Sequence, residues 1–97
     1  LEKESIYMKK AIVTVIGRDQ VGIIAAVCTR LSEHRVNVLD ISQTILQEYF
    51  TMIMLVDLSG SDVSFAALRD DLAAAGAQRG LDIRIQREDT FQAMHEL

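Results

Sequence analysis

The amino-acid sequence predicts an α+β fold, a ferredoxin-like βαββαβ plait with a four-stranded antiparallel sheet and two helices on one face. Two observations support this prediction. Four short runs rich in β-branched residues and two stretches of helical periodicity follow one another as strand, helix, strand, strand, helix, strand. The first and third strand runs are apolar on both parities, which is typical of central strands, so we expect the strand order 4-1-3-2.

The first strand is expected over residues 9–16, KKAIVTVI, because this run is rich in β-branched residues and ends at Gly17. Both parities of the run are apolar, which indicates burial on both faces. The loop GRDQVG then leads directly into a helical pattern. Asp19 in this loop is a candidate N-cap for the helix.

The first helix is predicted to extend to about Arg35. Its apolar residues recur at i, i+3, i+4 and i+7 and form one stripe: Ile24, Val27, Cys28 and Leu31. Cys28 is therefore expected to be an inert core residue. His34, close to the end of the helix, is expected to stabilise the helix dipole when it is charged.

A hairpin is predicted next in the chain. Residues 36–47 form its first strand, and a change in the parity of their apolar side chains indicates a β-bulge near Val38. Glu48 and Tyr49 are expected to form the turn. Residues 50–56 are apolar at nearly every position, as expected of a central strand.

The second helix is predicted after the turn and capping residues 59–62, SGSD. Gly76 and Gly80 are expected to bracket the end of this helix. Its inward face is expected to consist of apolar residues at helical spacing: Phe65, Leu68, Leu72 and Ala75.

The last strand and the two ends of the chain complete the predicted domain at residues 8–97. Residues 81–87 alternate between apolar and polar side chains, which predicts an edge strand with one exposed face. Phe91 and Met94 lie three residues apart and predict a short terminal helix. Residues 1–7 precede the first methionine and have an irregular polar pattern, so we expect a non-native remnant or a disordered segment there.

The composition argues against several classes of function. Fourteen acidic and ten basic residues give a net charge of -4, which opposes nucleic-acid binding, and the strands lack the stacking aromatics of RNA-binding plaits. No run approaches the roughly 18 apolar residues of a membrane span. A single cysteine permits no internal disulfide, so we expect a cytoplasmic protein without membrane contact. His95 and the acidic residues near it lack metal-ligand spacing, so no metal and no cofactor are expected.

The predicted sheet leaves one apolar face without helices over it. Ile12, Ile16 and either Met52 or Ile53 must point to this face, which a partner chain or the terminal helix would have to cover. The edge strand 36–47 also offers unpaired backbone groups. A chain this short buries only about two-thirds of the surface that its unfolded form exposes. We therefore expect a homodimer.

Particular stretches of the sequence resemble the ACT domain, a small-ligand-sensing plait common in regulators of amino-acid metabolism. They are IVTVIGRDQVGIIAAV and NVLDISQTI. MKKAIVTVIG, DISQTILQEYFTMIMLVDLS and the tail DIRIQREDTFQAMHEL are similar, more closely, to the free-standing ACT family UPF0237. That family is similar in turn to the ACT halves of glycine-cleavage repressors. The resemblance covers residues 8–97.

The resemblance implies a ligand site in a dimer whose edge strands join into one sheet. An amino acid would bind between the first strand–helix loop of one copy and the second strand of the other. Residue by residue, the loop supplies Asp19, Gln20, Val21, Gly22 and Ile23, and the start of the second strand supplies Asn37, Val38, Leu39 and Asp40. The family often has a proline at the position of Val21, so a less rigid loop is expected here.

Three of these residues have a structural and a functional interpretation. Gly22 serves as a turn glycine, or it lets the backbone N–H groups of the helix approach a carboxylate. Asp19 caps the helix, or it receives an ammonium group. Asn37 shapes a turn, or its amide donates to a carboxylate and accepts from an amine.

The expected function is that of a homodimeric, non-catalytic ACT-type regulatory domain that binds a small amino acid or a similar zwitterion. A structural or adaptor dimer without a ligand has the same fold and stays open as an alternative. An acylphosphatase-like enzyme on the same plait is disfavoured, because Ile23 and Ile24 follow the loop where a phosphate-holding arginine is needed. No Ser/His/Asp set or paired carboxylates offer another route to catalysis.

Overall fold

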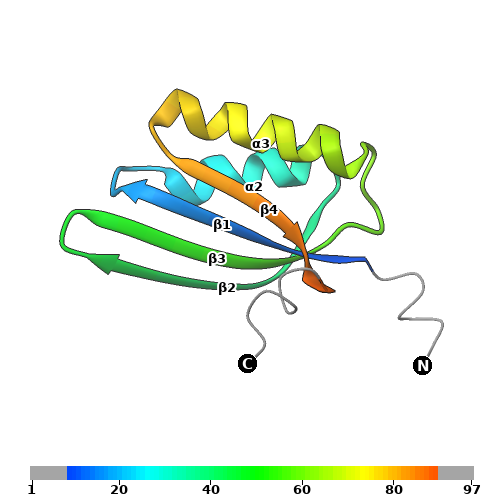
Figure 1. Cartoon of the computed structure of the whole chain (residues 1–97), viewed down its shortest axis with the longest axis horizontal. Coiled ribbons are helices and arrows are strands. Elements are labelled where there is room, and N and C mark those ends of the chain that lie inside the picture. The colour runs from blue at the N-terminus through cyan, green and yellow to red at the C-terminus, as the bar shows by residue number, and fades with distance from the viewer. Residues whose placement is uncertain (1–8, 90–97) are drawn as a thin grey trace.

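The computed structural model describes residues 9–89 and has the element order β-α-β-β-α-β (Figure 1). The elements are β1 (Lys10–Arg18), α2 (Ile23–Glu33), β2 (Asn37–Leu46), β3 (Tyr49–Asp57), α3 (Phe65–Arg79) and β4 (Asp82–Arg87). The predicted terminal helix and residues 1–7 lie outside the described residues. The predicted fold class is confirmed.

The four strands form one antiparallel sheet in the order β2-β3-β1-β4, which is the predicted order 4-1-3-2 counted from the other edge. Both helices lie on the same face of this sheet (Figure 1). β1 and β3 occupy the centre, as their apolar sequences predicted, and β2 and β4 form the two edges.

The core lies between the sheet and the two helices. Alternate residues of the central strands are fully buried there, for example Val13, which pairs with Met54, and Val15, which pairs with Met52. The prediction that β1 is buried on both faces is wrong. Among residues 9–89 no helix lies on its other face, and Ile16 is 50% exposed there. Of the two candidates in β3, Ile53 is the exposed one and Met52 is buried.

Helix α2 is shorter than predicted, and its buried stripe is different. Ile23, Val27 and Leu31 are buried, whereas Ile24 is 37% exposed. The helix ends at Glu33 because Arg35 adopts a left-handed φ of 61°, and Val36 N–H donates to the Leu31 carbonyl at 2.9 Å. Cys28 is half-buried and packs against the core.

The hairpin confirms the predicted bulge and corrects the predicted turn. The pairing of β2 with β3 shifts between Val38 and Asp40, so Leu39 is the extra residue. The turn consists of Gln47 and Glu48, one residue earlier than predicted, and Gln47 has a φ of 57°. The bulge directs Ile41 toward the helix-covered side of the sheet, where its pairing partner Met54 is buried.

Helix α3 begins at a side-chain cap and ends at a glycine. The Ser64 hydroxyl accepts a hydrogen bond from Ala67 N–H at 3.1 Å, and Gly80 ends the helix with a φ of 71°. Gly76 does not bracket the end, as was predicted, but lies inside the helix. A Cβ there would lie 2.7 Å from the Leu81 carbonyl oxygen, so Gly76 allows α3 to approach β4 closely.

Candidate functional site

The loop between β1 and α2 is held in a defined position. Gly22 is the N-cap of α2, with φ 86° and no capping side chain, so the prediction that Asp19 caps this helix is wrong. Asp19 instead donates its backbone N–H to the Glu48 carbonyl at 2.8 Å, which ties the loop to the β2–β3 turn. Ile23 anchors the loop in the core, while Val21 is 97% exposed.

Arg79, at the end of α3, completes this loop and was missed by the sequence analysis. Its Nη1 donates to Gln20 Oε1 at 3.3 Å and to the Val21 carbonyl at 3.4 Å, while Gln20 Nε2 donates to the Arg79 carbonyl at 3.0 Å. A Cβ on Gly22 would lie 3.9 Å from Arg79 Nη1. The signal that could have found it is topological, because α3 ends at the same end of the plait at which α2 begins.

The chemistry of this loop suits an anion. The first N–H groups of α2 receive no side-chain cap, and no carboxylate pairs with Arg79 among residues 9–89. Unpaired N–H groups at a helix start and a guanidinium are both favourable partners for a carboxylate. A groove of about 450 Å³ between α2 and α3 starts beside Gly22 and Arg79, so there is open space next to the loop.

The second half of the predicted site lies at the opposite end of the sheet. Asn37 pairs with Asp57 of β3, and Asp57 pairs in turn with Lys10, so Asn37 lies level with the start of β1. Loop 19–23 follows Arg18, at the end of β1. The nine residues of β1 separate the two halves by roughly 27 Å. A single chain therefore does not bring Asp19, Gln20, Val21, Gly22 and Ile23 together with Asn37, Val38, Leu39 and Asp40.

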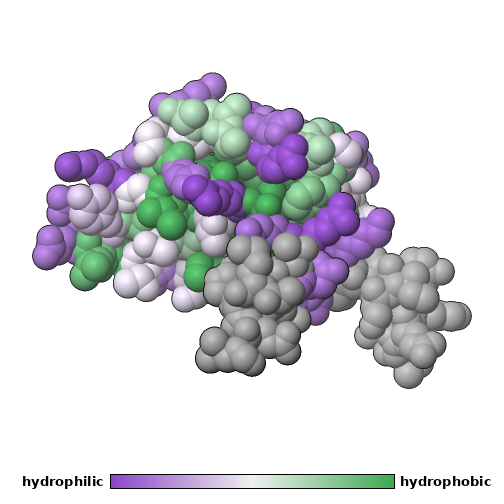
Figure 2. Space-filling model, in the orientation of Figure 1, coloured by the Kyte–Doolittle hydropathy of each residue, from purple (hydrophilic) through white to green (hydrophobic). Residues whose placement is uncertain are grey.

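Strand β2 is an edge with little cover from the rest of the chain. All its residues are exposed except Val38, which is half-buried. The side chains include four large apolar ones: Leu39, Ile41, Ile45 and Leu46. Asp40 accepts the N–H of Ile41 at 2.9 Å, a local bond that leaves its second carboxylate oxygen available. On the face drawn in Figure 2, hydrophobic surface is exposed in the middle of the molecule, with hydrophilic side chains around and across it.

His34 links the end of α2 to α3. Its Nε2 lies 2.9 Å from Asp71 Oδ2 on α3, and its Nδ1 lies 3.4 Å from Asp62 Oδ1. The hydrogen bond with Asp71 raises the pKa of His34 above 6.5, against the opposing effect of burial. Arg30 also contacts Asp71, at 3.4 Å. Within residues 9–89 no group of three or more His, Cys, Asp or Glu side chains could hold a metal ion.

No helix among residues 9–89 has the length and hydrophobicity needed to span a membrane.

Comparisons with known proteins identify the family. The sequence model of the ACT domain matches residues 9–86. A UPF0237 protein of Bifidobacterium longum is 54% identical over 90 residues, covering 93% of this chain and all of the relative. A UPF0237 protein of Clostridium acetobutylicum is 56% identical over 88 residues, covering 91% of this chain and 99% of the relative.

Solved structures agree with this assignment. An ACT domain protein from Streptococcus pneumoniae superimposes with a TM-score of 0.75 at 43% identity, covering 90% of this chain and 98% of that one. A formyltetrahydrofolate deformylase from Pseudomonas syringae gives a TM-score of 0.74 at 21% identity, covering 89% of this chain and 30% of that one, which shows the fold alone. The chain therefore belongs to the ACT domain family of regulatory ligand-binding domains and, within it, to the UPF0237 proteins.

Proposed function

We propose that this protein is a non-catalytic regulatory domain of the cytoplasm that forms a homodimer and binds a small amino acid, or a similar zwitterion, at the seam between two copies. The observation that carries the proposal is the separation of the two halves of the site. Loop 19–23 and residues 37–40 lie at opposite ends of one sheet, and the edge between them is exposed.

Antiparallel pairing of two β2 edges would bring the two halves together. In a register centred between Ile41 and Ser42, the partner's Asn37 lies beside Leu46. Leu46 directly precedes the β2–β3 turn, to which Asp19 is hydrogen-bonded. The partner's Asn37 then lies three strand spacings, about 14 Å, from the end of β1, a gap that side chains and a small ligand can fill.

The exposed side chains of β2 support this pairing. Ile41 and Ile45 point to the helix-covered side of the sheet, yet they are 40% and 52% exposed. Ile24 of α2, on the same side of the sheet, is exposed as well. A second copy would cover these side chains and would pair the open backbone groups of the edge. A sheet of eight strands would result.

The ligand chemistry follows from the groups on each half. The carboxylate of an amino acid would lie at the uncapped start of α2 beside Gly22 and Arg79. Asp19, or Asp40 of the other copy, would receive the ammonium group. The partner's Asn37 would donate to the ligand and accept from it, because a side-chain amide offers both functions.

The experiment measures the oligomeric state by light scattering and the melting temperature with each of the twenty amino acids. We expect a dimer and a rise in melting temperature with at least one amino acid, because a ligand that binds only the folded state stabilises it by mass action. Gly22→Ala should abolish this rise, since the new methyl group lies between the loop backbone and Arg79.

Gly80→Ala is the matched control. Gly80 also has a left-handed φ, of 71°, but a Cβ there meets no atom within 4 Å. This variant should lose similar backbone stability and keep the response to the ligand. A dimer that responds to none of the amino acids would favour the structural or adaptor dimer. A monomer at working concentrations would refute the proposal.

A further inference from the structure

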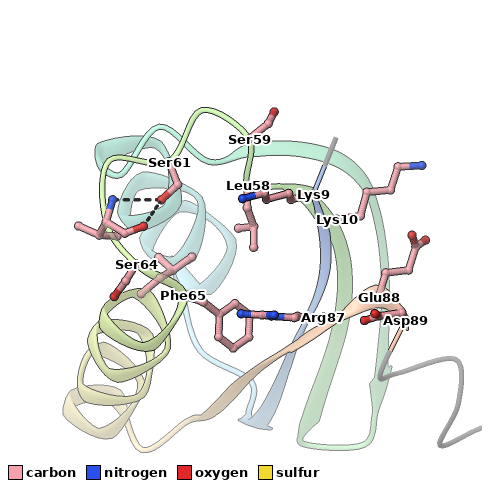
Figure 3. Close-up of a pocket in the computed structure, with 12 residues that line it drawn as sticks. Lys9, Lys10, Leu58, Ser59, Ser61, Ser64, Phe65, Arg87, Glu88 and Asp89 are labelled. Atoms are coloured by element: carbon pink, nitrogen blue, oxygen red, sulfur yellow. Dashed lines mark hydrogen bonds between the residues drawn. The ribbon is translucent and has the colours of Figure 1, made fainter. Parts of the chain in front are cut away.

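A second cavity lies at the end of the molecule away from loop 19–23. Its volume is about 610 Å³, and it is enclosed by the start of β1, the β3–α3 connection, the start of α3 and the end of β4 (Figure 3). Leu58, Val63 and Leu68 form an apolar lining. Charged and hydroxyl side chains make up most of the remaining lining, so an apolar part lies beside polar groups that can orient a small molecule.

Arg87 is held in this cavity in a geometry that leaves its hydrogen-bond donors available. Its guanidinium carbon lies 4.9 Å from the centre of the Phe65 ring, and Figure 3 shows the two side chains facing one another. This cation–π contact engages no acceptor, so the guanidinium keeps N–H groups that can donate to a ligand. Within residues 9–89 no carboxylate forms an ion pair with Arg87.

Lys9 provides a second cation on the same side of the sheet. Arg87 pairs with Ala11, which is buried on the helix-covered face, and Lys9 has the same parity as Ala11. Figure 3 shows the Lys9 side chain extending toward the β3–α3 connection, whereas Lys10 and Glu88 extend away from it. No ion pair engages Lys9 in the described part of the chain.

The remaining polar groups of the cavity are compatible with an anion. The Ser64 hydroxyl oxygen accepts the N–H of Ala67, and its own proton has no acceptor among residues 9–89, so it is available to a ligand. Asp89 at the rim already takes part in another interaction. The chain as a whole is acidic, with a net charge of -4, whereas three basic residues, Lys9, Lys10 and Arg87, line this cavity with two acidic ones, Glu88 and Asp89.

We propose that this cavity binds a small organic anion, in which an apolar body packs on Leu58, Val63 and Leu68 and a carboxylate or phosphate group contacts Arg87 and Lys9. Arg87, already ordered by Phe65, would bind the oxyanion in a bidentate manner, and Lys9 would act as a point charge. The site is separate from the seam between β2 edges, because it is formed by β1, β4 and α3 of a single chain.

The test is a titration of the full chain, labelled with nitrogen-15, with phenyl phosphate, benzoate and inorganic phosphate at constant ionic strength. We expect saturable shifts of the backbone resonances of residues 58–65 and 87, with a Kd of about 1 mM or below. Comparing the Kd of phenyl phosphate with that of benzoate shows whether the site prefers a phosphate or a carboxylate group. Inorganic phosphate should bind more weakly than phenyl phosphate because it lacks the apolar body.

Two pairs of variants distinguish binding at this site from nonspecific attraction of the anion to positive charge. Arg87→Gln and Lys9→Gln should each weaken binding about tenfold. Arg84→Gln removes a charge from β4 on the other face and should change Kd by less than about twofold. Lys10 lies at the rim of the cavity but extends away from the β3–α3 connection, so Lys10→Gln should weaken binding clearly less than Lys9→Gln. The melting temperature of each variant checks its fold. If Arg87→Gln does not fold, the comparison of Kd between Lys9→Gln and Lys10→Gln still tests the proposal.

The proposal is overturned by an absence of saturable shifts in residues 58–65, or by equal weakening in all four variants. Failure of the amino-acid site at the seam would leave these results unchanged, because the probes carry no ammonium group and the variants lie outside loop 19–23 and β2.

Discussion

The two edge strands differ sharply, although both present isoleucines to the helix-covered side of the sheet. On β4, Ile83 and Ile85 are only 6% and 5% exposed, whereas Ile41 and Ile45 on β2 are 40% and 52% exposed. Helix α3 covers β4 because Gly76 allows a close approach, and no helix covers β2 in the same way. The chain therefore covers one edge of its core and leaves the other exposed, and this exposed edge is the one that the proposed dimer would cover.

The largest expected effect comes from truncating the covered edge. Ile85→Ala should lower the free energy of unfolding by about 3 kcal/mol, because it removes a buried side chain and leaves a cavity. Urea unfolding at two protein concentrations measures this loss, which should be the same at both.

Ile41→Ala is the matched variant on the open edge. In the monomer it should lower the free energy of unfolding by less than about 1 kcal/mol, because Ile41 buries less apolar surface than Ile85 does. At higher protein concentration its cost should grow, since the proposed dimer would bury this side chain. Equal costs for the two variants at every concentration would mean that the edges do not differ as described.

A second change tests why α3 covers β4. Gly76→Ala should lower the free energy of unfolding by about 2 kcal/mol, although alanine favours helices, because its methyl group would overlap the Leu81 carbonyl and Ile83. Urea unfolding measures the effect. A neutral or stabilising result would show that the approach of α3 to β4 is not limited by Gly76.

A third change tests what covers β2. The double variant Ile41→Lys and Ile45→Lys should dissociate the dimer while costing the monomer no more than about 1 kcal/mol, because both side chains are partly exposed already. Light scattering measures the mass, and circular dichroism checks the fold. Ile53→Lys, on the helix-free face, is the control. If only Ile53→Lys yields monomers, the copies associate through that face instead.

The smallest effect concerns the link between the two helices. Asp71 raises the pKa of His34 in the folded state above 6.5, so the folded protein holds this proton more tightly than the unfolded chain. The resulting stabilisation is complete below about pH 6.5 and is lost as the pH rises through the folded-state pKa. We expect the free energy of unfolding to fall by a fraction of a kcal/mol over this rise.

The measurement is urea unfolding between about pH 5 and pH 9, a range that spans the titration of histidine. His34→Gln should remove this part of the pH dependence, and His95→Gln should leave it in place. An unchanged slope in His34→Gln would contradict the link between His34 and Asp71.

Much of the fold was predictable because it depends on local patterns. The structure adopts three backbone features that local patterns predicted. They are the strands at the β-branched runs, the bulge near Val38 and the end of the second helix at Gly80. The errors arose where two neighbouring residues could each fill the same structural role. Ile23 and Ile24 are both apolar, and only the packing of α2 determined that Ile23 is the buried one.

The candidate site was only partly predictable for a related reason. Loop 19–23 is continuous in the sequence, and its glycine marks the left-handed backbone at Gly22. Arg79 lies far from this loop in the sequence, and no local pattern connects it to Gln20. The cavity beside Arg87 and Lys9 was missed for the same reason, since its lining comes from three separate segments of the chain.

The sequence by itself determined the order of the elements, the central place of β1 and β3, and the family, because hydrophobic periodicity and turn residues act over a few neighbours. Only the tertiary structure decided which edge is covered, which cations are left unpaired, and that the two halves of the predicted ligand site lie at opposite ends of one chain. These features depend on which distant segments meet in space, and that outcome follows from packing the whole chain at once.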